Sequence, residues 1–317
     1  MYLLRKPILA MSESRTVRDL LTRAPVTRDV VQRFVAGEGT DQVTAAIKAL
    51  RSKGLQATCD FLGEDTTSTA QADATVAAYL ELIESLTSAG LVTGAEMSVK
   101  LSAVGQALPT GPDVPGGGPC YAATGARTIV QAAYAAGARV TLDMEDHTTV
   151  DSTLAILAGL RREFPDVGIA VQAMLLRTPE DLAALTGPGS RVRLVKGAYN
   201  EPESVAHTDP EQIDLAYVRA LRLLMDGAGY PMVGTHDPRL IAIAEKLASD
   251  RGRGYDSWEY QMLYGIRPGE QARLAGHGHT VRVYVPYGHD WYGYFTRRLA
   301  ERPANLMFFL RSFTSQK

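Results

Sequence analysis

Two adjacent arginines near the end of the chain are the most specific chemical feature of the sequence. They stand in the segment YFTRRLAE, residues 294–301. On a helix, spacings of three, four and seven residues bring four polar side chains to one face: Tyr294, Arg297, Arg298 and Glu301. A guanidinium is a planar fork of N–H donors that matches a carboxylate, and Glu301 can hold Arg297 from the next turn. The segment predicts a carboxylate-binding site; a solvated surface helix is the alternative.

Two lysines are candidate nucleophiles. Lys100 lies in SVKLS and Lys196 in LVKGAY. A lysine that forms a Schiff base with a carbonyl substrate would make the protein an aldolase-type enzyme. This class of enzyme is the first alternative to the function developed below.

The elements that must position these groups repeat along the chain. From residue 55 onward, short β-branched or apolar runs alternate with longer amphipathic stretches, which is typical of βα units and a parallel sheet. The predicted strands are residues 55–63, 96–101, 138–144, 167–174, 191–199, 231–237, 257–263 and 280–286. The predicted helices between and after them are residues 70–89, 123–136, 149–163, 179–186, 209–227, 238–250, 268–275 and 290–301. Helix N-caps are predicted at Thr178, Asp237 and Asp290.

Eight β/α repeats over about 260 residues are typical of an α/β fold of the (β/α)8 TIM-like barrel kind. The alternative, a doubly wound open sheet, usually has a glycine-rich turn after its first strand, where this chain reads FLGEDTT. Residues 1–54 are predicted to form an N-terminal helical arm, with helices at 12–22, 28–37 and 41–52, and residues 55–317 the catalytic barrel. The last predicted helix would lie over the active site. Glycines and prolines in 108–120 predict an exposed loop.

Polar side chains follow the predicted strands, where barrel enzymes keep their catalytic groups. They are Glu64, Lys100, Asp143, Glu145, Gln172, Arg177, Arg193, Lys196, Thr235, His236, Asp237, Gln261, Tyr284 and Tyr287. Solvated strand ends would explain any one of them, but a succession at the same end favours a ligand site. The strand interiors are expected to hold mostly apolar residues and threonine. Lys100, Arg193, Lys196 and the arginine pair would give this rim a local excess of positive charge.

Composition and cysteine content exclude several other classes. The 33 basic and 35 acidic side chains leave a formal charge of −2, with no basic block that would favour nucleic acid. Two distant cysteines indicate no disulfide framework, and Cys59 in the first strand predicts core packing. His277 and His279 precede the last strand, away from the catalytic rim, so no metal site is expected. No signal peptide or apolar run of about 20 residues is present, which predicts a cytoplasmic protein.

The motifs together resemble the proline dehydrogenase family of flavoenzymes. The resemblance runs in order through residues 55–305: FLGE, VKLS, LDMED, VQAM, RLVKGAY, THD, EYQMLYG, VYVPYG and YFTRRLAE. RLVKGAY together with YxxRRxxE is highly specific, and the single-activity bacterial branch is the closer fit. The family fold is a (β/α)8 barrel, in agreement with the repeat pattern.

The resemblance implies oxidation of L-proline to Δ1-pyrroline-5-carboxylate, with hydride transfer to FAD. Electrons would pass on to a membrane quinone, which implies transient peripheral contact with the inner face of the membrane. Asp143 and Arg193 would be the catalytic residues. The substrate-binding residues would be Lys100, Arg297, Arg298, Tyr284, Tyr294, Leu263, Ala198, Tyr199, Glu301 and Glu64. The cofactor-binding residues would be Met144, Gln172, Arg193, Lys196, Gly197, Ala198, Thr235 and His236.

The residues alone leave two alternatives to a flavoenzyme open. A Schiff-base-lysine barrel aldolase would need no flavin and would form a covalent adduct on Lys100 or Lys196. A non-enzymatic carboxylate-binding protein would hold an amino acid without converting it.

Overall fold

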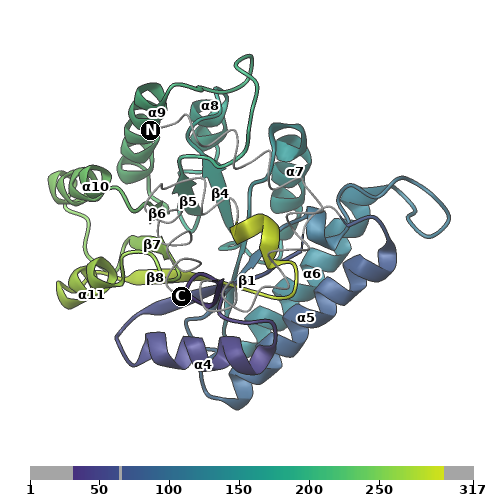
Figure 1. Cartoon of the computed structure of the whole chain (residues 1–317). Helices are drawn as coiled ribbons and strands as arrows, with labels where there is room; N and C mark the ends of the chain where they lie inside the picture. Colours follow the sequence, from purple (N-terminus) through teal and green to yellow (C-terminus); the bar gives the residue numbers. More distant parts are fainter. Residues whose placement is uncertain (1–30, 64–65, 296–317) are drawn as a thin grey trace, which may run out of the picture.

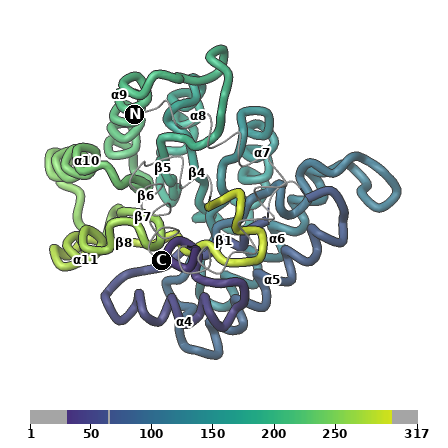
Figure 2. Tube along the Cα trace, in the orientation of Figure 1, coloured from purple at the N-terminus to yellow at the C-terminus, as the bar shows by residue number. Residues whose placement is uncertain are grey.

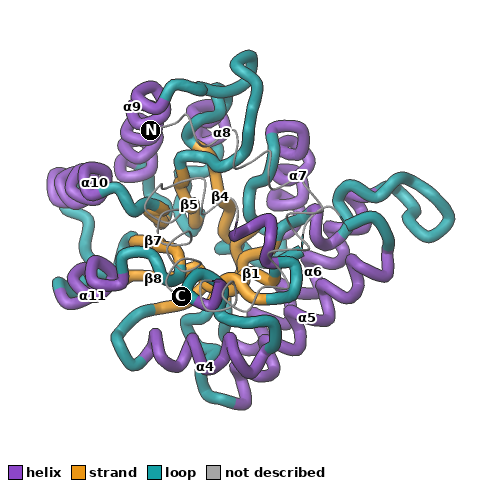
Figure 3. Tube along the Cα trace, viewed as in Figure 1, coloured by secondary structure: helices purple, strands orange, loops and turns teal. Residues whose placement is uncertain are grey.

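The computed structural model describes residues 31–63 and 66–295 of the 317-residue chain. Eight parallel strands follow one another in sequence order around a closed barrel, as Figures 1 and 3 show. Their bounds are β1 Gln56–Phe61, β2 Glu96–Val99, β3 Arg139–Leu142, β4 Gly168–Gln172, β5 Arg191–Val195, β6 Tyr230–Gly234, β7 Glu259–Leu263 and β8 Val281–Tyr287. β8 pairs with β1 from Gln56↔Arg282 to Phe61↔Tyr287, which closes the barrel. The predicted (β/α)8 fold is confirmed.

Helices cover the outside of the barrel (Figure 1). They are α4 Thr40–Arg51, α5 Thr69–Ser88, α6 Gly118–Ala136, α7 Val150–Leu160, α8 Thr178–Ala183, α9 Pro210–Asp226, α10 Pro238–Asp250 and α11 Pro268–Gly276. Short 3₁₀ turns, η2 Ser102–Val104 and η3 His147–Thr149, follow β2 and β3. Of the predicted 290–301 helix, residues 291–295 are helical, Asp290 directly precedes them, and residues 296–301 lie outside the described residues. The tube in Figure 2 follows this alternation from α4 to the C-terminal helix.

Several predicted boundaries are wrong for local reasons. The strand predicted to reach residue 199 ends at Val195, and the chain turns at Gly197, whose φ of +114° suits glycine. The loop predicted over 108–120 ends early because α6 begins at Gly118, with Pro119 in its first turn. Arg177, not Thr178, precedes α8, whereas Asp237 caps α10 as predicted. In the predicted 28–37 helix, only residues 31 and 32 of the described part are helical.

The described part of the arm packs on the barrel. Val43, Ile47 and Leu50 of α4 belong to the main hydrophobic core. A second apolar cluster joins the segment before α4 to the start of the C-terminal helix; it comprises Val31, Phe34, Val35, Leu62, Ile266, Tyr294 and Phe295. The division between arm and barrel after residue 54 stays a prediction.

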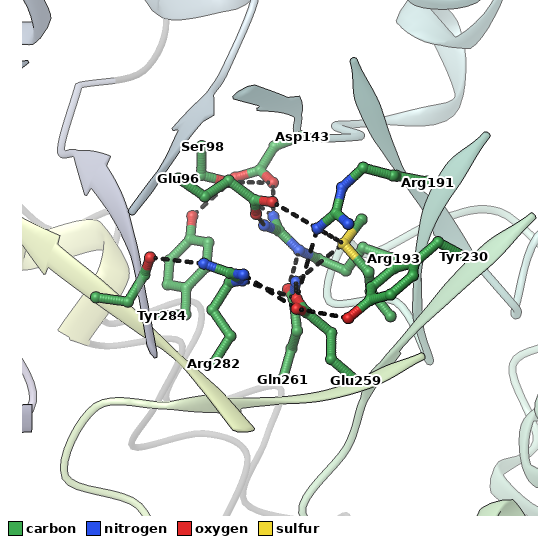
Figure 4. A network of polar contacts seen from close by, with 12 residues as sticks. Glu96, Ser98, Asp143, Arg191, Arg193, Tyr230, Glu259, Gln261, Arg282 and Tyr284 are labelled. Carbon is green, nitrogen blue, oxygen red and sulfur yellow. Dashed lines mark hydrogen bonds and ion pairs between the residues drawn. The ribbon is translucent and has the colours of Figure 1, made fainter. Parts of the chain in front are cut away.

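The inside of the barrel is polar. Strand side chains alternate between the two faces of the sheet. In β5, Val192 and Leu194 join the core beneath the helices, while Arg191 and Arg193 form ion pairs with Glu96 of β2. Figure 4 shows the resulting network, to which β7 and β8 also contribute. Within the described part of the chain, no helix is long and apolar enough to span a bilayer.

Candidate active site

Arg193 stands at the centre of the polar network, and its side chain is 4% exposed. Its Nε donates to Gln261 Oε1 at 2.5 Å, and its Nη2 to Glu96 Oε1 at 2.9 Å. Its Nη1 donates to Ser98 Oγ at 2.7 Å and also to Asp143 Oδ1. A guanidinium has five N–H groups, so these four bonds leave one on Nη2 that bonds to no other described residue. Four contacts, from two strands and from Asp143 just after the end of β3, fix the orientation of Arg193.

A second layer of paired charges lies beneath Arg193, towards the N-terminal ends of the strands, where Glu96, Arg191 and Glu259 each begin a strand; Figure 4 labels these residues. Glu96 Oε2 accepts from Arg191 Nη2 at 3.2 Å, and Glu259 accepts from Arg282 Nε and Nη2 at 2.7 and 3.0 Å. Burial would raise the pKa of Glu96, but Arg282, Arg191 and Arg193 together lower it to about 2. The three arginines and the three carboxylates of Glu96, Asp143 and Glu259 balance, which is how buried charges are tolerated.

Lys100 connects this network to the carboxyl ends of the strands. Its Nζ lies 2.5 Å from Asp60 Oδ1, 3.8 Å from Asp143 Oδ2 and 3.3 Å from the Tyr284 hydroxyl. That hydroxyl donates to Asp143 Oδ2 at 2.8 Å. Burial, together with the charges of Asp143 and Asp60, raises the pKa of Tyr284 well above its usual value, so the phenol stays protonated. The structure thus brings three of the predicted site residues together: Lys100, Asp143 and Tyr284.

Asp60 is a site residue that the sequence analysis missed. Its side chain is fully buried in β1 and pairs with Lys100. Burial raises its pKa more than Lys100 lowers it, and Asp143 raises it further. Its Oδ2 has no hydrogen-bond partner among the described residues. An acid inside the apolar run TCDF is the signal that could have revealed it.

Other predicted substrate-binding residues lie at or beyond the ends of β5, β7 and β8. Leu263 and Tyr284 pack against the apolar cluster that contains Tyr294, and Ala198 and Tyr199 are half-buried beyond β5. Arg297, Arg298, Glu301 and Glu64 lie outside the described residues.

Apart from Arg193, which lies within β5, the predicted cofactor residues lie at or just after the ends of β3, β4, β5 and β6. Met144, Gln172 and Thr235 are buried. Gln172 Nε2 donates to the Glu145 carbonyl at 2.7 Å, which fixes the orientation of the amide. Gly197 is required where it stands, because a Cβ on it would collide with the Met174 side chain.

His236 has a defined tautomer. Its Nε2 lies 2.8 Å from the Leu263 amide nitrogen, which donates to it. A ring nitrogen that accepts carries no proton, so the neutral imidazole bears its proton on Nδ1. Arg267, in the left-handed conformation at φ 50°, donates to the His236 carbonyl at 2.6 Å and holds this strand end in place.

The sequence predicts a local excess of positive charge at the rim where the strands end. For Lys100, Arg193 and Lys196 this prediction is wrong, because each of them is paired with carboxylates. Lys196 forms ion pairs with Asp214 and with Asp237, the latter at 3.4 Å. Lys100 and Arg193 have the partners given above. Both lysines are held in ion pairs with aspartates, and this argues against a Schiff-base role for either of them.

A closed parallel barrel with ionised side chains gathered where its strands end defines an enzyme of the (β/α)8 class. Residues 43–311 match the family model described as proline dehydrogenase. The chain belongs to the proline dehydrogenase family, and this membership makes it an enzyme of that kind.

Two curated relatives match over nearly their whole length. The chain is 39% identical to "Proline dehydrogenase" of Deinococcus radiodurans over 308 residues, with 96% of each chain covered. It is 36% identical to "Proline dehydrogenase 1" of Bacillus subtilis, with 98% of each covered. A crystal structure of proline utilization A from Bdellovibrio bacteriovorus, inactivated by N-propargylglycine, is similar with a TM-score of 0.78 at 24% identity, over 92% of this chain and 34% of that one. That likeness supports the fold.

Proposed function

We propose that the protein oxidises L-proline to Δ1-pyrroline-5-carboxylate, with FAD as the hydride acceptor and a membrane quinone as the final electron acceptor. The observation that carries this proposal is the Arg193 guanidinium, held by four protein contacts with one N–H left over, beside the Lys100 ammonium. A ligand that needs a directed hydrogen-bond donor fits this arrangement.

The chemistry of the side chains suits a flavin. Bound FAD would supply the hydride acceptor that no protein side chain provides. The remaining N–H of Arg193 would donate to the flavin ring near N5, and Gln172 would face the carbonyls of its pyrimidine portion. Contacts with the rest of the cofactor would come from Met144, Lys196, Gly197, Ala198, Thr235 and His236.

The substrate carboxylate would be held by Arg297, Arg298 and Lys100, with Glu301 and Glu64 orienting the arginines. The walls around the pyrrolidine ring would be Tyr284, Tyr294, Leu263, Ala198 and Tyr199. Asp143 would act by fixing Arg193 and Tyr284, both of which it contacts. Hydride loss leaves an imine and needs no protein nucleophile, so positioning would supply most of the rate.

One spectrum tests the proposal. The purified protein is expected to show flavin absorbance that bleaches when L-proline is added without oxygen. A colourless protein that FAD cannot reconstitute would refute the proposal. An aldolase would instead be trapped on a lysine by borohydride, and a binding protein would retain proline without bleaching.

The quinone and membrane parts of the proposal need their own test. Protein reduced with proline should transfer electrons to a soluble quinone analogue, and it should sediment with anionic lipid vesicles more than the oxidised form does. Reoxidation by oxygen alone, with no acceleration by quinone, would contradict this part.

A further inference from the structure

The charged layer beneath Arg193 has no place in the function proposed above. Its central member is Glu96, which is fully buried and contacts two arginines from one carboxylate. Oε1 lies 2.9 Å from Arg193 Nη2, and Oε2 lies 3.2 Å from Arg191 Nη2. The same nitrogen of Arg193 that bonds Glu96 carries the remaining N–H. Glu96 therefore determines where that N–H can lie.

We infer that Glu96 is a positioning residue of the flavin site: it holds Arg193 and offsets its charge, and thereby sets the redox potential of the bound flavin. The inference rests on the proposed function only in that Arg193 faces FAD. Glu96 itself is the first residue of β2, whereas Asp143, which forms the other charged contact to Arg193, follows the end of β3. It acts through Arg193 and does not touch the reacting atoms.

Two contributions of Glu96 can be separated by substitution. Glu96→Gln removes the charge and leaves a single acceptor oxygen for two guanidinium groups. Arg193 then carries uncompensated positive charge, which stabilises the electron-rich reduced flavin. Glu96→Asp keeps the charge but shortens the side chain by one methylene, so it can no longer reach both arginines.

Glu259 provides the matched control. It is 1% exposed, like Glu96 it is buried against an arginine, and its partner is Arg282. It also lies 3.9 Å from Arg191, and its hydrogen-bonded path to Arg193 runs through the amide of Gln261. Its charge raises the pKa of Arg193 less than the charges of Asp143 and Glu96 do. In Glu259→Gln the new amide oxygen can still accept the hydrogen bond from Gln261, so the contact between Gln261 and Arg193 is preserved. Like Glu96→Gln, this substitution leaves a buried arginine without its carboxylate partner, so the loss of folding stability should be similar.

The first measurement is the midpoint potential of the bound flavin, titrated with dithionite and a reference dye. Glu96→Gln should raise it by about 30 mV or more, which is a tenfold change in a two-electron equilibrium. Glu259→Gln should change that equilibrium less than threefold, although its melting temperature should fall about as far as that of Glu96→Gln. Equal potentials in wild type and a folded Glu96→Gln, or equal shifts in both variants, would overturn the inference.

The second measurement keeps the inference testable where Glu96→Gln does not fold. Glu96→Asp should leave the potential unchanged and slow anaerobic flavin reduction by proline at least tenfold, with the KM for proline within threefold of wild type. A wild-type rate in Glu96→Asp would contradict the positioning role. Because the dithionite titration uses no proline, a wild-type protein that binds FAD but ignores proline would refute the proposed function and still test Glu96. The FAD dissociation constant of each apoprotein reports whether the site remains intact.

Discussion

At the scale of single residues, the arginine pair carries the proposed substrate affinity. Arg297→Met should raise the KM for L-proline at least tenfold, since a charged hydrogen bond contributes roughly 1.5–3 kcal/mol. Steady-state kinetics at constant pH measure this. Arg273→Met is the control, because Arg273 pairs with Glu270 on α11 and should leave the KM unchanged. A KM near wild type in Arg297→Met would make the segment a solvated surface helix.

The pH dependence of the proposed reaction should follow the protonation of the substrate amine. Proline can release hydride only when its amine is unprotonated, and neighbouring cations favour that form. We expect kcat/KM for proline to rise with pH between about 6 and 9. Tyr284 is not the source of the rise, because burial and the charges of Asp143 and Asp60 hold its pKa well above this range. Tyr284→Phe should retain the rise, and a profile that is flat in wild type would contradict the expectation.

At the scale of elements, the N-caps of α9 and α10 are both aspartates, but Asp237 of α10 also forms an ion pair with Arg239. Asp209 accepts from the Gln212 amide, and Asp237 accepts from the Arg239 amide. Only Asp237 also pairs with Lys196. Replacing either aspartate by alanine should lower the free energy of unfolding by about 1 kcal/mol. Asp237→Ala alone should also weaken FAD binding, which titration of the apoprotein measures; equal FAD affinities would argue against Lys196 as a cofactor ligand.

The elements were also the most predictable level of the structure. The hydrophobic pattern identified all eight strands because each has a buried apolar face. Asp237 followed by Pro238 correctly predicted the start of α10. The interior could not be foreseen in the same way. The alternation in RVRLV shows that Arg191 and Arg193 share a face, but not that this face is inside the barrel. Their partner Glu96 lies 95 and 97 positions away in sequence, so the pairing depends on the closed topology.

At the scale of the whole molecule, the buried network makes stability depend on acid pH. The pKa of Glu96 is about 2 in the folded state, below its ordinary value of 4.5. Between these values the unfolded chain binds the extra proton, so stability is present above about pH 4.5 and is lost as pH falls towards 2. The loss is on the order of 3 kcal/mol for this group. The raised pKa of Asp60 acts in the opposite direction, since its protonation in acid favours the folded state.

Urea titrations at a series of pH values would measure this dependence. Glu96→Gln should flatten the curve between about pH 5 and 2 relative to wild type, because the titrating group is gone. Glu96→Asp keeps a carboxylate and serves as the control. A curve for Glu96→Gln as steep as that of wild type would place the acid sensitivity elsewhere.

The neutral pairing inside the barrel also constrains how the sequence can vary. Removing Arg191, Arg282, Glu96 or Glu259 alone leaves a buried charge without its partner, which is strongly destabilising, whereas replacing both partners by apolar residues can be tolerated. Substitutions at these positions should therefore occur in charge-balanced pairs among related sequences. A laboratory library that randomises the interior should return combinations rather than single changes, and those combinations would identify which pairs Arg193 depends on.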